Sequence, residues 1–256
     1  MTRKAPALEF SVSKIGVCAS TNEIAKEMAY LGAAEGTVVV AEEQTAGRGT
    51  KGRTWHSARG LGLYVSLILR PCPAARLSLL PLAAGLAARE AVEIASGLAA
   101  GLRWPNDLVL TGKKLGGILC ETEFSGAEVV FAVVGLGVNL AHRPFDFPAG
   151  LRDLAVSIAG AGGRCRADSL LEAYLAEFKE WYGDAIEGRA GRLVRAFELH
   201  SVFKPGDEVT VEMTEGRREG RYLGLAVDGT IRLAFEDGER RLASADVVRI
   251  GRPPSI

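Results

Sequence analysis

The sequence predicts an α+β protein with one mixed, largely antiparallel sheet, helices packed on it, and a small C-terminal β-barrel. Three observations lead to this fold class: helical spacing of apolar residues, short β-segments with short gaps, and a change of character at residues 203–206. Short gaps favour antiparallel neighbours, because a parallel pair needs a long crossover connection. With 256 residues the chain has room for two domains, which we expect at residues 1–203 and 204–256.

The larger domain should contain strands and three helices, each defined by its hydrophobic pattern. Strands are expected at residues 14–17, 37–42, 63–69, 102–104, 107–110, 114–121 and 129–134, and helices at residues 22–31, 78–94 and 170–186. The second helix is almost wholly apolar, so it should lie inside the domain rather than on its surface. The third should open with a capping box formed by Ser169 and Glu172.

The C-terminal domain is expected to contain five short strands joined by tight turns. The strands are expected at residues 208–213, 221–225, 230–233, 239–242 and 247–250. Turn pairs that end in glycine, at residues 215–216, 228–229 and 237–238, separate them. Short strands at this spacing are typical of a small closed barrel.

The composition is that of an ordinary globular chain, with 48% hydrophobic residues, 24% charged residues and a formal net charge of zero. No apolar run approaches the roughly 20 residues that a membrane span requires. We expect no secretion signal, because no apolar segment follows the charged N-terminus. Overall neutrality gives no general reason to expect nucleic-acid binding. The cysteines are too scattered for a zinc knuckle or a disulfide framework, which is compatible with a cytoplasmic location: Cys18, Cys72, Cys120 and Cys165.

The most informative segment is the glycine-rich basic run AGRGTKGRTW at residues 46–55. No acidic residue lies between Glu43 and Glu90, although seven Lys or Arg residues do. The run partly matches a dinucleotide fingerprint and a P-loop, but both need a helix after the loop, and here a strand is expected. The alternative to a ligand site is a solvated basic loop. We expect the side chains of Arg48 and Arg53, with exposed loop amides, to bind an anion such as a nucleotide phosphate.

Several motifs in one order together resemble the biotin–protein ligase family. The family pattern GRGRxGRxW corresponds to residues 47–55, KWPND to residues 103–107, KLxGIL to residues 114–119, STN to residues 20–22 and GxGxN to residues 135–139. The resemblance covers residues 15–250 and implies a fold like that of class II aminoacyl-tRNA synthetases and biotin ligases, with an SH3-like barrel. At Thr50 the chain departs from the family, which has an arginine that helps to hold the adenylate.

The resemblance implies a ligase that converts biotin and ATP to biotinyl-5'-AMP and pyrophosphate, and then transfers biotin to a lysine of a biotin carboxyl carrier domain. ATP would arrive as MgATP, with Mg²⁺ held mainly by the phosphates and no metal ligands from the protein. The chain resembles the single-function class, which lacks an N-terminal DNA-binding domain. We therefore expect a monomer or homodimer with no nucleic-acid or membrane partner.

The same resemblance implies the site residues. Biotin would contact Ser20, Thr21, Asn22, Gln44, Gly47, Arg48, Lys114, Gly116 and Gly117. ATP and the adenylate would contact Arg48, Gly49, Thr50, Arg53, Trp55, Asn106, Lys114 and Asn139. The catalytic residues would be Lys114, Arg48 and Asp107. Because the biotin carboxylate must approach a phosphate, and two unit charges 4 Å apart interact by roughly 4 kcal/mol at an effective dielectric near 20, cations are the main requirement.

Some of these residues have a structural alternative. Ser20 and Glu23 match a capping box, and Asp107 could simply form a turn. Lys114 could be a surface lysine, and Trp55 could pin the loop rather than stack on adenine. The glycine pair of the KLxGIL motif could mark a bulge.

Two rival functions remain open at this point. A lipoate ligase or octanoyl transferase would share the fold, whereas a non-enzymatic nucleic-acid-binding protein could use the barrel and the basic loop. The barrel offers only Tyr222 and Phe235 as aromatic residues, which is a poor stacking platform. For the ligase, we expect loop 45–59 to be mobile without ligand and to close over the adenylate.

Overall fold

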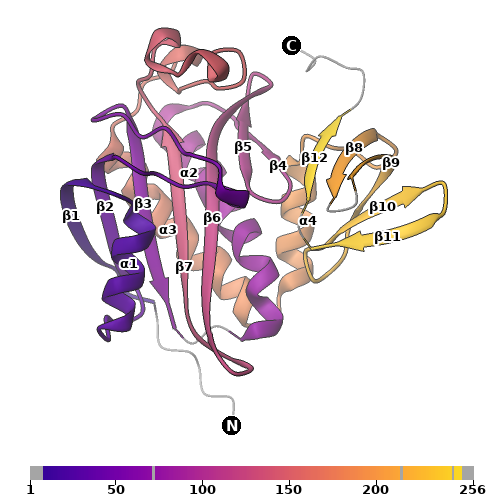
Figure 1. Cartoon of the computed structure of the whole chain (residues 1–256), viewed down its shortest axis with the longest axis horizontal. Coiled ribbons are helices and arrows are strands. Elements are labelled where there is room, and N and C mark those ends of the chain that lie inside the picture. The colour runs from indigo at the N-terminus through magenta and orange to yellow at the C-terminus, as the bar shows by residue number, and fades with distance from the viewer. Residues whose placement is uncertain (1–7, 71–72, 214–215, 244, 250–256) are drawn as a thin grey trace.

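A seven-stranded mixed sheet forms the larger part of the molecule, with strand order β1-β2-β3-β7-β6-β5-β4 (Figure 1). The computed structural model describes residues 8–70, 73–213, 216–243 and 245–249. The strands are β1 Ser11–Cys18, β2 Thr37–Gln44, β3 Gly62–Leu69, β4 Gly101–Arg103, β5 Asp107–Leu110, β6 Lys113–Ser125 and β7 Glu128–Asn139. The β1–β2 pair is parallel and the other five pairs are antiparallel, which confirms the predicted sheet.

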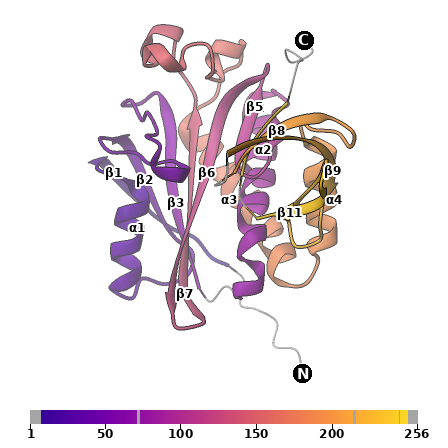
Figure 2. The same ribbon diagram turned by 45° about the vertical axis from the view of Figure 1, so that its right-hand side comes forward.

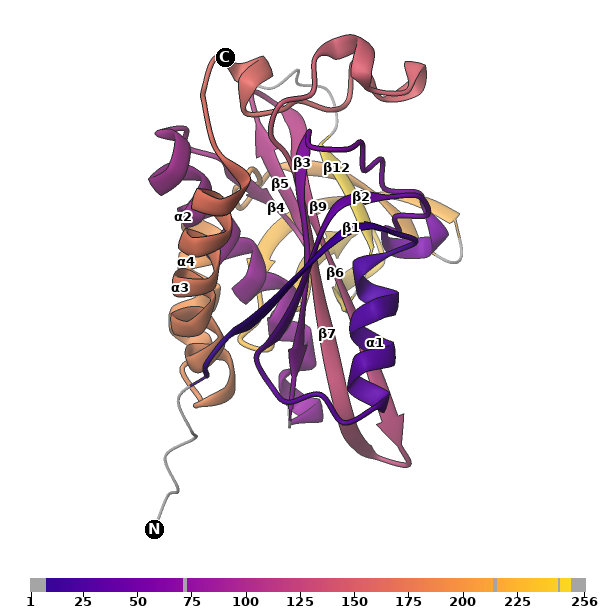
Figure 3. The same cartoon turned by 90° about the vertical axis from the view of Figure 1, so that its left-hand side faces the viewer.

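Helices cover both faces of this sheet, as the side view in Figure 3 shows. Helix α1, Thr21–Tyr30, packs Ala25 and Ala29 against a small cluster on one face. Helices α2, Leu80–Ser96, and α3, Ala167–Ile186, pack on the opposite face, where the main core lies. Strand β3 is buried along its whole length because it is covered on both sides. The polar residues of the candidate site therefore lie on the α1 side of the sheet, and the apolar core lies on the side of α2 and α3.

Helix α2 is buried between the sheet and α3, as its apolar sequence predicted. The capping box predicted for α3 is wrong, because the N-cap residue is Arg166 and Ser169 lies inside the first turn. Ser20 is the N-cap of α1 by position, but its side chain makes no capping hydrogen bond. Helix α4, Ala190–His200, was not predicted, although its buried Leu193, Val194 and Phe197 have helical spacing.

Short 3₁₀ turns connect the main elements, and residues 140–166 form an upper loop that crosses above the sheet in Figure 1. The turns are η1 Thr50–Gly52, η2 Ala74–Leu79, η3 Pro144–Asp146, η4 Ala149–Leu151 and η5 Ala159–Ala161. Among the helices of the described ranges, none has the length and apolar character needed to cross a membrane.

A second, five-stranded antiparallel sheet follows α4 and is turned towards the viewer in Figure 2. Its strands are β8 Glu208–Met213, β9 Gly216–Leu225, β10 Ile231–Phe235, β11 Gly238–Leu242 and β12 Asp246–Arg249. All five lie within a few residues of their predicted positions, although turn residue 215 and the predicted end at residue 250 fall outside the described residues. The pairing gives the order β11-β10-β9-β8-β12, and closure into an SH3-like barrel stays a prediction.

Candidate active site

Two glycines of β7 allow α1 and the glycine-rich loop to lie directly on the sheet. A Cβ on Gly135 would overlap the side-chain oxygen of Asn22, and a Cβ on Gly137 would lie 2.5 Å from Trp55 Nε1. Any side chain larger than hydrogen at either position would force its neighbour away from the strand. The GxGxN motif therefore forms a flat surface on β7, where Asn22 packs against Gly135 and Trp55 packs against Gly137.

A buried polar network surrounds the start of α1. Gln44 Oε1 accepts hydrogen bonds from the backbone N–H and the hydroxyl of Thr21, at 2.8 and 3.1 Å. Ser66 Oγ donates to Asn22 Oδ1 at 2.6 Å and lies 2.8 Å from Thr21 Oγ1. Gln44 Nε2 donates to Ser57 Oγ at 2.8 Å. The structure thus brings together three predicted biotin-site residues from α1 and β2.

Ser66 and Ser57 are members of this network that the sequence interpretation missed. Ser66 is fully buried, and it is the one small polar residue in the otherwise apolar strand GLYVSLIL. That isolated serine was a usable signal, because a buried hydroxyl needs a hydrogen-bond partner. Ser20 is also buried, at 3% exposure. Gly47 packs so tightly that a Cβ would lie 2.6 Å from the Trp55 carbonyl oxygen.

A second group of residues gathers around Lys114. Lys114 Nζ lies 2.5 Å from Asp107 Oδ1 and 5.6 Å from the centre of the Trp55 ring. A Cβ on Gly117 would lie 3.3 Å from the same Nζ. The neighbouring Lys113 points elsewhere and reaches the Arg152 carbonyl at 3.5 Å. Lys114, rather than Lys113, therefore faces the glycine-rich loop.

The upper loop fixes the backbone of Lys114. Its amide donates to the Leu154 carbonyl at 2.8 Å, and its carbonyl accepts from the Val156 amide at 3.0 Å. Asn139 Nδ2, at the end of β7, donates to the Val156 carbonyl at 3.1 Å. Asn139 was predicted to lie near the adenylate; here its side-chain amide holds the loop that positions Lys114.

Two other predicted residues make contacts within the sheet. Asn106 Nδ2 donates to the Ile118 carbonyl at 2.6 Å, which ties the β4–β5 turn to β6. A Cβ on Gly116 would lie 2.7 Å from the Gly137 carbonyl oxygen and 2.9 Å from Leu108 Cδ1. Gly116 therefore permits close strand packing beside a register shift in β5, which supports the bulge alternative. Of the glycine pair, Gly117 is the one that borders Lys114.

Arg48 lies in a compact cluster of four charged side chains that also includes Glu23, Lys26 and Glu121. Its guanidinium pairs with Glu23 and contacts Glu121 Oε1 at 2.7 Å. Lys26 Nζ contacts the same two carboxylates at 2.8 and 3.1 Å. Burial would raise the pKa of Glu121, but hydrogen bonds from Asn22 and Lys26 and the nearby positive charges hold that pKa below its usual range. The cluster links Arg48 to the network at α1.

The tip of the glycine-rich loop is exposed and folds on itself. The amide of Gly49 donates to the Arg53 carbonyl at 2.7 Å, and the Arg53 guanidinium donates to the Thr50 hydroxyl at 2.9 Å. The basic residues outside the loop do not join it. Arg59 pairs with Glu42, and Arg89 pairs with Glu93 on α2. The run of positive charge in the sequence is therefore divided among several places in the fold.

Two histidines that are far apart in the sequence meet behind the loop. The His56 and His142 rings have centroids 5.9 Å apart, and His142 stacks on Phe147 at 4.7 Å. His142 is 1% exposed, and both of its ring nitrogens are buried. Burial lowers the pKa of His142 to about 4, with a smaller effect from His56.

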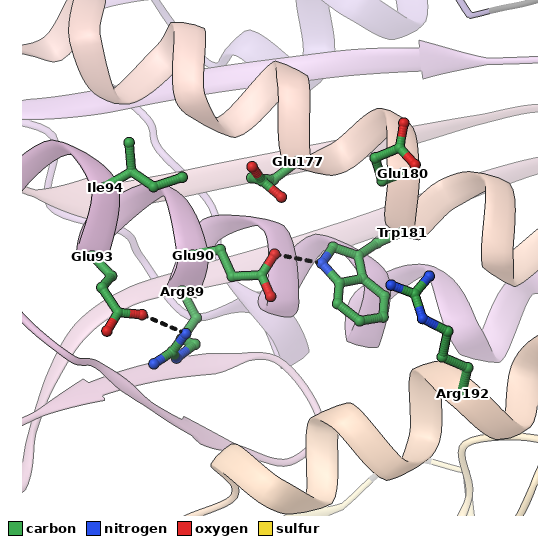
Figure 4. Close-up of a pocket in the computed structure, with 8 residues that line it drawn as sticks. All are labelled: Arg89, Glu90, Glu93, Ile94, Glu177, Glu180, Trp181 and Arg192. Atoms are coloured by element: carbon green, nitrogen blue, oxygen red, sulfur yellow. Dashed lines mark hydrogen bonds and ion pairs between the residues drawn. The ribbon is translucent and has the colours of Figure 1, made fainter.

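A separate groove of about 530 Å³ lies among α2, α3 and α4 (Figure 4). Trp181 Nε1 donates to Glu90 Oε2 at 2.7 Å within it. Burial, followed by a hydrogen bond shared with Glu90, raises the pKa of Glu177. The lining residues are Arg89, Glu90, Glu93, Ile94, Glu177, Glu180, Trp181 and Arg192. None of the predicted site residues is among them, so the groove is distinct from the cluster around Lys114.

Comparison with known proteins gives consistent matches. The profile of the biotin/lipoate A/B protein ligase family matches residues 15–139. The bifunctional ligase/repressor BirA of Bacillus subtilis is 34% identical over 233 residues, which is 90% of this chain and 71% of that protein. The biotin–[acetyl-CoA-carboxylase] ligase of Paracoccus denitrificans is 32% identical over 239 residues, covering 89% of this chain and 96% of its own length.

Solved structures match across most of the chain as well. The biotin protein ligase from Aquifex aeolicus, in complex with biotin and ATP, superposes with a TM-score of 0.80 and 29% identity. The match covers 93% of this chain and 98% of the Aquifex protein. The seven-stranded sheet, its helices and the C-terminal sheet together therefore follow an arrangement already seen in that structure.

Proposed function

Because the chain belongs to the biotin/lipoate A/B protein ligase family, and within it to the biotin protein ligases, we propose that it biotinylates a carrier domain. It is an ATP-dependent ligase by that membership. In the proposed reaction, biotin and ATP give biotinyl-5'-AMP and pyrophosphate, and the biotinyl group then passes to a lysine of a biotin carboxyl carrier domain. Residues 1–203 would form the catalytic domain, and residues 204–256 a small SH3-like barrel.

One observation carries the proposal: three separated motifs converge on Lys114. Asp107 of the WPND motif lies 2.5 Å from Lys114 Nζ, and Trp55 of the glycine-rich loop lies 5.6 Å from it, measured to the ring centre. Gly137 of the GxGxN motif supports Trp55. Lys114 thus places a cation beside the loop proposed for ATP, and we propose that both anions meet there.

The first step joins two anions. A biotin carboxylate oxygen forms a bond to the α-phosphorus of ATP, and the bond to the departing pyrophosphate breaks. We assign Lys114 the role of bridging the carboxylate and the α-phosphate, since it offers a point charge with three donors. Arg48 would exchange Glu23 and Glu121 for one of these anions, and Arg53 would reach the phosphates that leave.

Biotin is proposed to lie at the start of α1. Its ureido ring presents N–H and C=O groups, which need partners when buried. Ser20, Thr21, Asn22 and Gln44 supply hydroxyl and amide groups of both kinds. Ser66 already holds Thr21 and Asn22, and Ser57 holds Gln44. Such pre-ordering reduces the entropy lost when a ligand binds.

The second step is attack by a neutral amine. The carrier lysine forms an amide bond to the biotinyl carbonyl carbon, AMP leaves with the electrons of the anhydride bond, and the amine loses a proton. We propose that Asp107 orients this amine, because its carboxylate lies beside Lys114 and is only partly buried. Trp55 lies beside Lys114 and would either stack on adenine or hold the glycine-rich loop in place.

Magnesium would enter with ATP in this proposal. No group of three or more His, Cys, Asp or Glu side chains within the described ranges could hold a metal ion. Mg²⁺ bound to phosphates would neutralise part of their charge. The proposal also includes a cytoplasmic location, a monomeric or homodimeric state and no DNA-binding repressor activity.

The direct test is to incubate the protein with MgATP, biotin and a carrier domain, and to measure the mass of the carrier. We expect one biotinyl addition, which should disappear when the acceptor lysine is replaced by arginine. Biotin-dependent exchange between ATP and pyrophosphate should report the first step alone. A parallel arm with lipoate or octanoate tests the nearest rival, and exchange that depends on these acids instead of biotin would refute the proposal.

A further inference from the structure

Trp104 connects the hairpin that carries Asp107 to the C-terminal sheet. Its side chain is 2% exposed, and Nε1 donates a 2.9 Å hydrogen bond to the backbone carbonyl of Gly229. Gly229 lies in the turn between β9 and β10, on the far side of the boundary between the two sheets. A buried indole N–H needs such a partner, since a buried donor left unpaired destabilises the fold.

The turn that receives Trp104 also fits closely against the region before α2. Gly229 has a φ of +81°, and a Cβ there would lie 3.2 Å from both Leu79 Cδ2 and the Ser78 carbonyl oxygen. Ser78 Oγ donates a 2.7 Å hydrogen bond to the Asp228 carbonyl. The turn is therefore held from two sides, by Ser78 and by Trp104.

The β4–β5 hairpin, which carries Trp104, forms one edge of the seven-stranded sheet. Trp104 lies in the turn between β4 and β5, three residues before Asp107. On the outer side of β4, the Val202 amide donates to the Leu102 carbonyl at 2.8 Å. On the inner side, the Ile118 amide donates to the Asn106 carbonyl at 2.8 Å. The turn is thus placed between β6 and the chain that leads to the C-terminal sheet.

We propose that the C-terminal sheet positions Asp107 against Lys114 through the hydrogen bond from Trp104 to Gly229. Trp104 is then a positioning residue, because it acts on the site through the hairpin turn. The proposal rests on the roles given above to Asp107 and Lys114. It predicts that loosening this one contact changes the turnover number more than the binding of biotin, whose network at α1 lies on other strands.

The test compares Trp104→Phe, which keeps an aromatic ring but removes the N–H donor, with the wild-type chain. Steady-state transfer of biotin to a carrier domain should show kcat lowered by about 10-fold, since small misplacements of reacting groups are costly, with KM for biotin changed by less than about 2-fold. Ser78→Ala is the matched control. It removes the hydrogen bond that holds the same turn from the other side, so it should lower Tm while kcat stays near the wild-type value.

A second variant reaches the same contact without altering the indole. Gly229→Ala must displace the turn, because of its positive φ and its close neighbours, and it should reproduce the loss in kcat. Wild-type kcat in both Trp104→Phe and Gly229→Ala would overturn the proposal. An equal loss in Ser78→Ala would also overturn it, because the effect would then reflect docking of the sheet in general.

Hydrogen exchange gives a readout that does not depend on ligase activity. The Ile118 amide should exchange faster in Trp104→Phe than in Ser78→Ala, since its acceptor is the carbonyl of Asn106 in the same turn. Equal exchange in the two variants would refute the coupling even in an active enzyme. Faster exchange in a protein that fails to activate biotin would support the coupling and refute the proposed function.

Discussion

Lys114 Nζ and Asp107 Oδ1 lie 2.5 Å apart on the neighbouring strands β6 and β5. The pair places a cation and a carboxylate beside the Trp55 ring, with Gly117 leaving the space next to the ammonium group open. A cation suits the meeting of two anions, and a carboxylate suits the arrival of an amine. The first step of the proposed reaction therefore uses the positive member of this ion pair, and the second step uses the negative member. Variants of the two residues can separate the two steps.

Replacing Lys114 by alanine should slow adenylate formation by about 100-fold or more, because a charge-stabilising donor is lost where negative charge gathers. Biotin-dependent ATP–pyrophosphate exchange measures this step. Lys113→Ala is the control, since Lys113 reaches the Arg152 carbonyl on the upper loop instead. Near-normal exchange in Lys114→Ala would remove this residue from the mechanism.

Replacing Asp107 by asparagine should affect the transfer step more than the activation step. Asparagine keeps the size of the side chain but lacks the charged acceptor that orients the amine and takes up the proton it loses, and such groups contribute about 100-fold. Single-turnover transfer from isolated biotinyl-adenylate to a carrier domain should slow accordingly. If transfer keeps its wild-type rate while exchange falls, Asp107 serves Lys114 rather than the amine.

Replacing Gly137 by alanine should destabilise the protein, because the added Cβ would lie 2.5 Å from Trp55 Nε1. Overpacking of this kind costs about 1–3 kcal/mol. Chemical denaturation followed by tryptophan fluorescence measures the loss. Gly16→Ala on β1 is the control, since nothing lies within 4 Å of a Cβ there. Equal stability of the two variants would show that Trp55 moves freely off the strand.

Replacing Thr50 by arginine should slow release of the adenylate. The family pattern has arginine at this position, and a hydrogen bond to a charged group is worth about 1.5–3 kcal/mol, or roughly 10-fold or more in the release rate. Thr50→Ala is the control, because it removes the hydroxyl that Arg53 contacts and adds no charge. Release can be followed with labelled adenylate and an excess of unlabelled competitor. Identical rates in the arginine and wild-type proteins would refute the expectation.

Replacing His142 by phenylalanine should make stability less dependent on pH in acid. The folded pKa of about 4 lies below the ordinary value near 6.5, so the unfolded chain binds the proton first as pH falls. Stability should therefore decline from about pH 6.5 to about pH 4, by up to about 3 kcal/mol from this group. Phenylalanine keeps the stacking on Phe147 but cannot titrate. Parallel curves of Tm against pH for both proteins would contradict this assignment.

Much of the fold could be predicted because its signals are local. The apolar run of α2 and the short gaps between β4, β5, β6 and β7 were sufficient for the mixed sheet. The start of α3 was placed wrongly, since Ser169 and Glu172 match a capping box while the chain already turns at Arg166. Strand β7 extends beyond its predicted end, because its glycines weaken the strand pattern but are needed for packing against α1 and the loop.

Candidate site residues that belong to a sequence motif could be predicted. Those that depend on contacts between residues far apart in the sequence could not. The KLxGIL motif singles out Lys114, which in the structure contacts Asp107 of the WPND motif, and its catalytic role stays a prediction. Glu121 was missed, because its partner Asn22 lies 99 residues away in the sequence. Glu23 was interpreted from the sequence only as part of a capping box, so its contact with Arg48 was also missed. Partners across a sheet follow from register, which the sequence alone does not provide.

The cluster of Arg48 with Glu23, Lys26 and Glu121 makes the resting site close to electrically neutral. An incoming phosphate or carboxylate must replace anionic partners that Arg48 already has, so binding is an exchange rather than a new attraction. Added salt weakens the old pairs as well as the new one. Ligand affinity should therefore fall less steeply with ionic strength than it would if Arg48 had no carboxylate partners. Polyanions other than the substrate should bind only weakly at this surface.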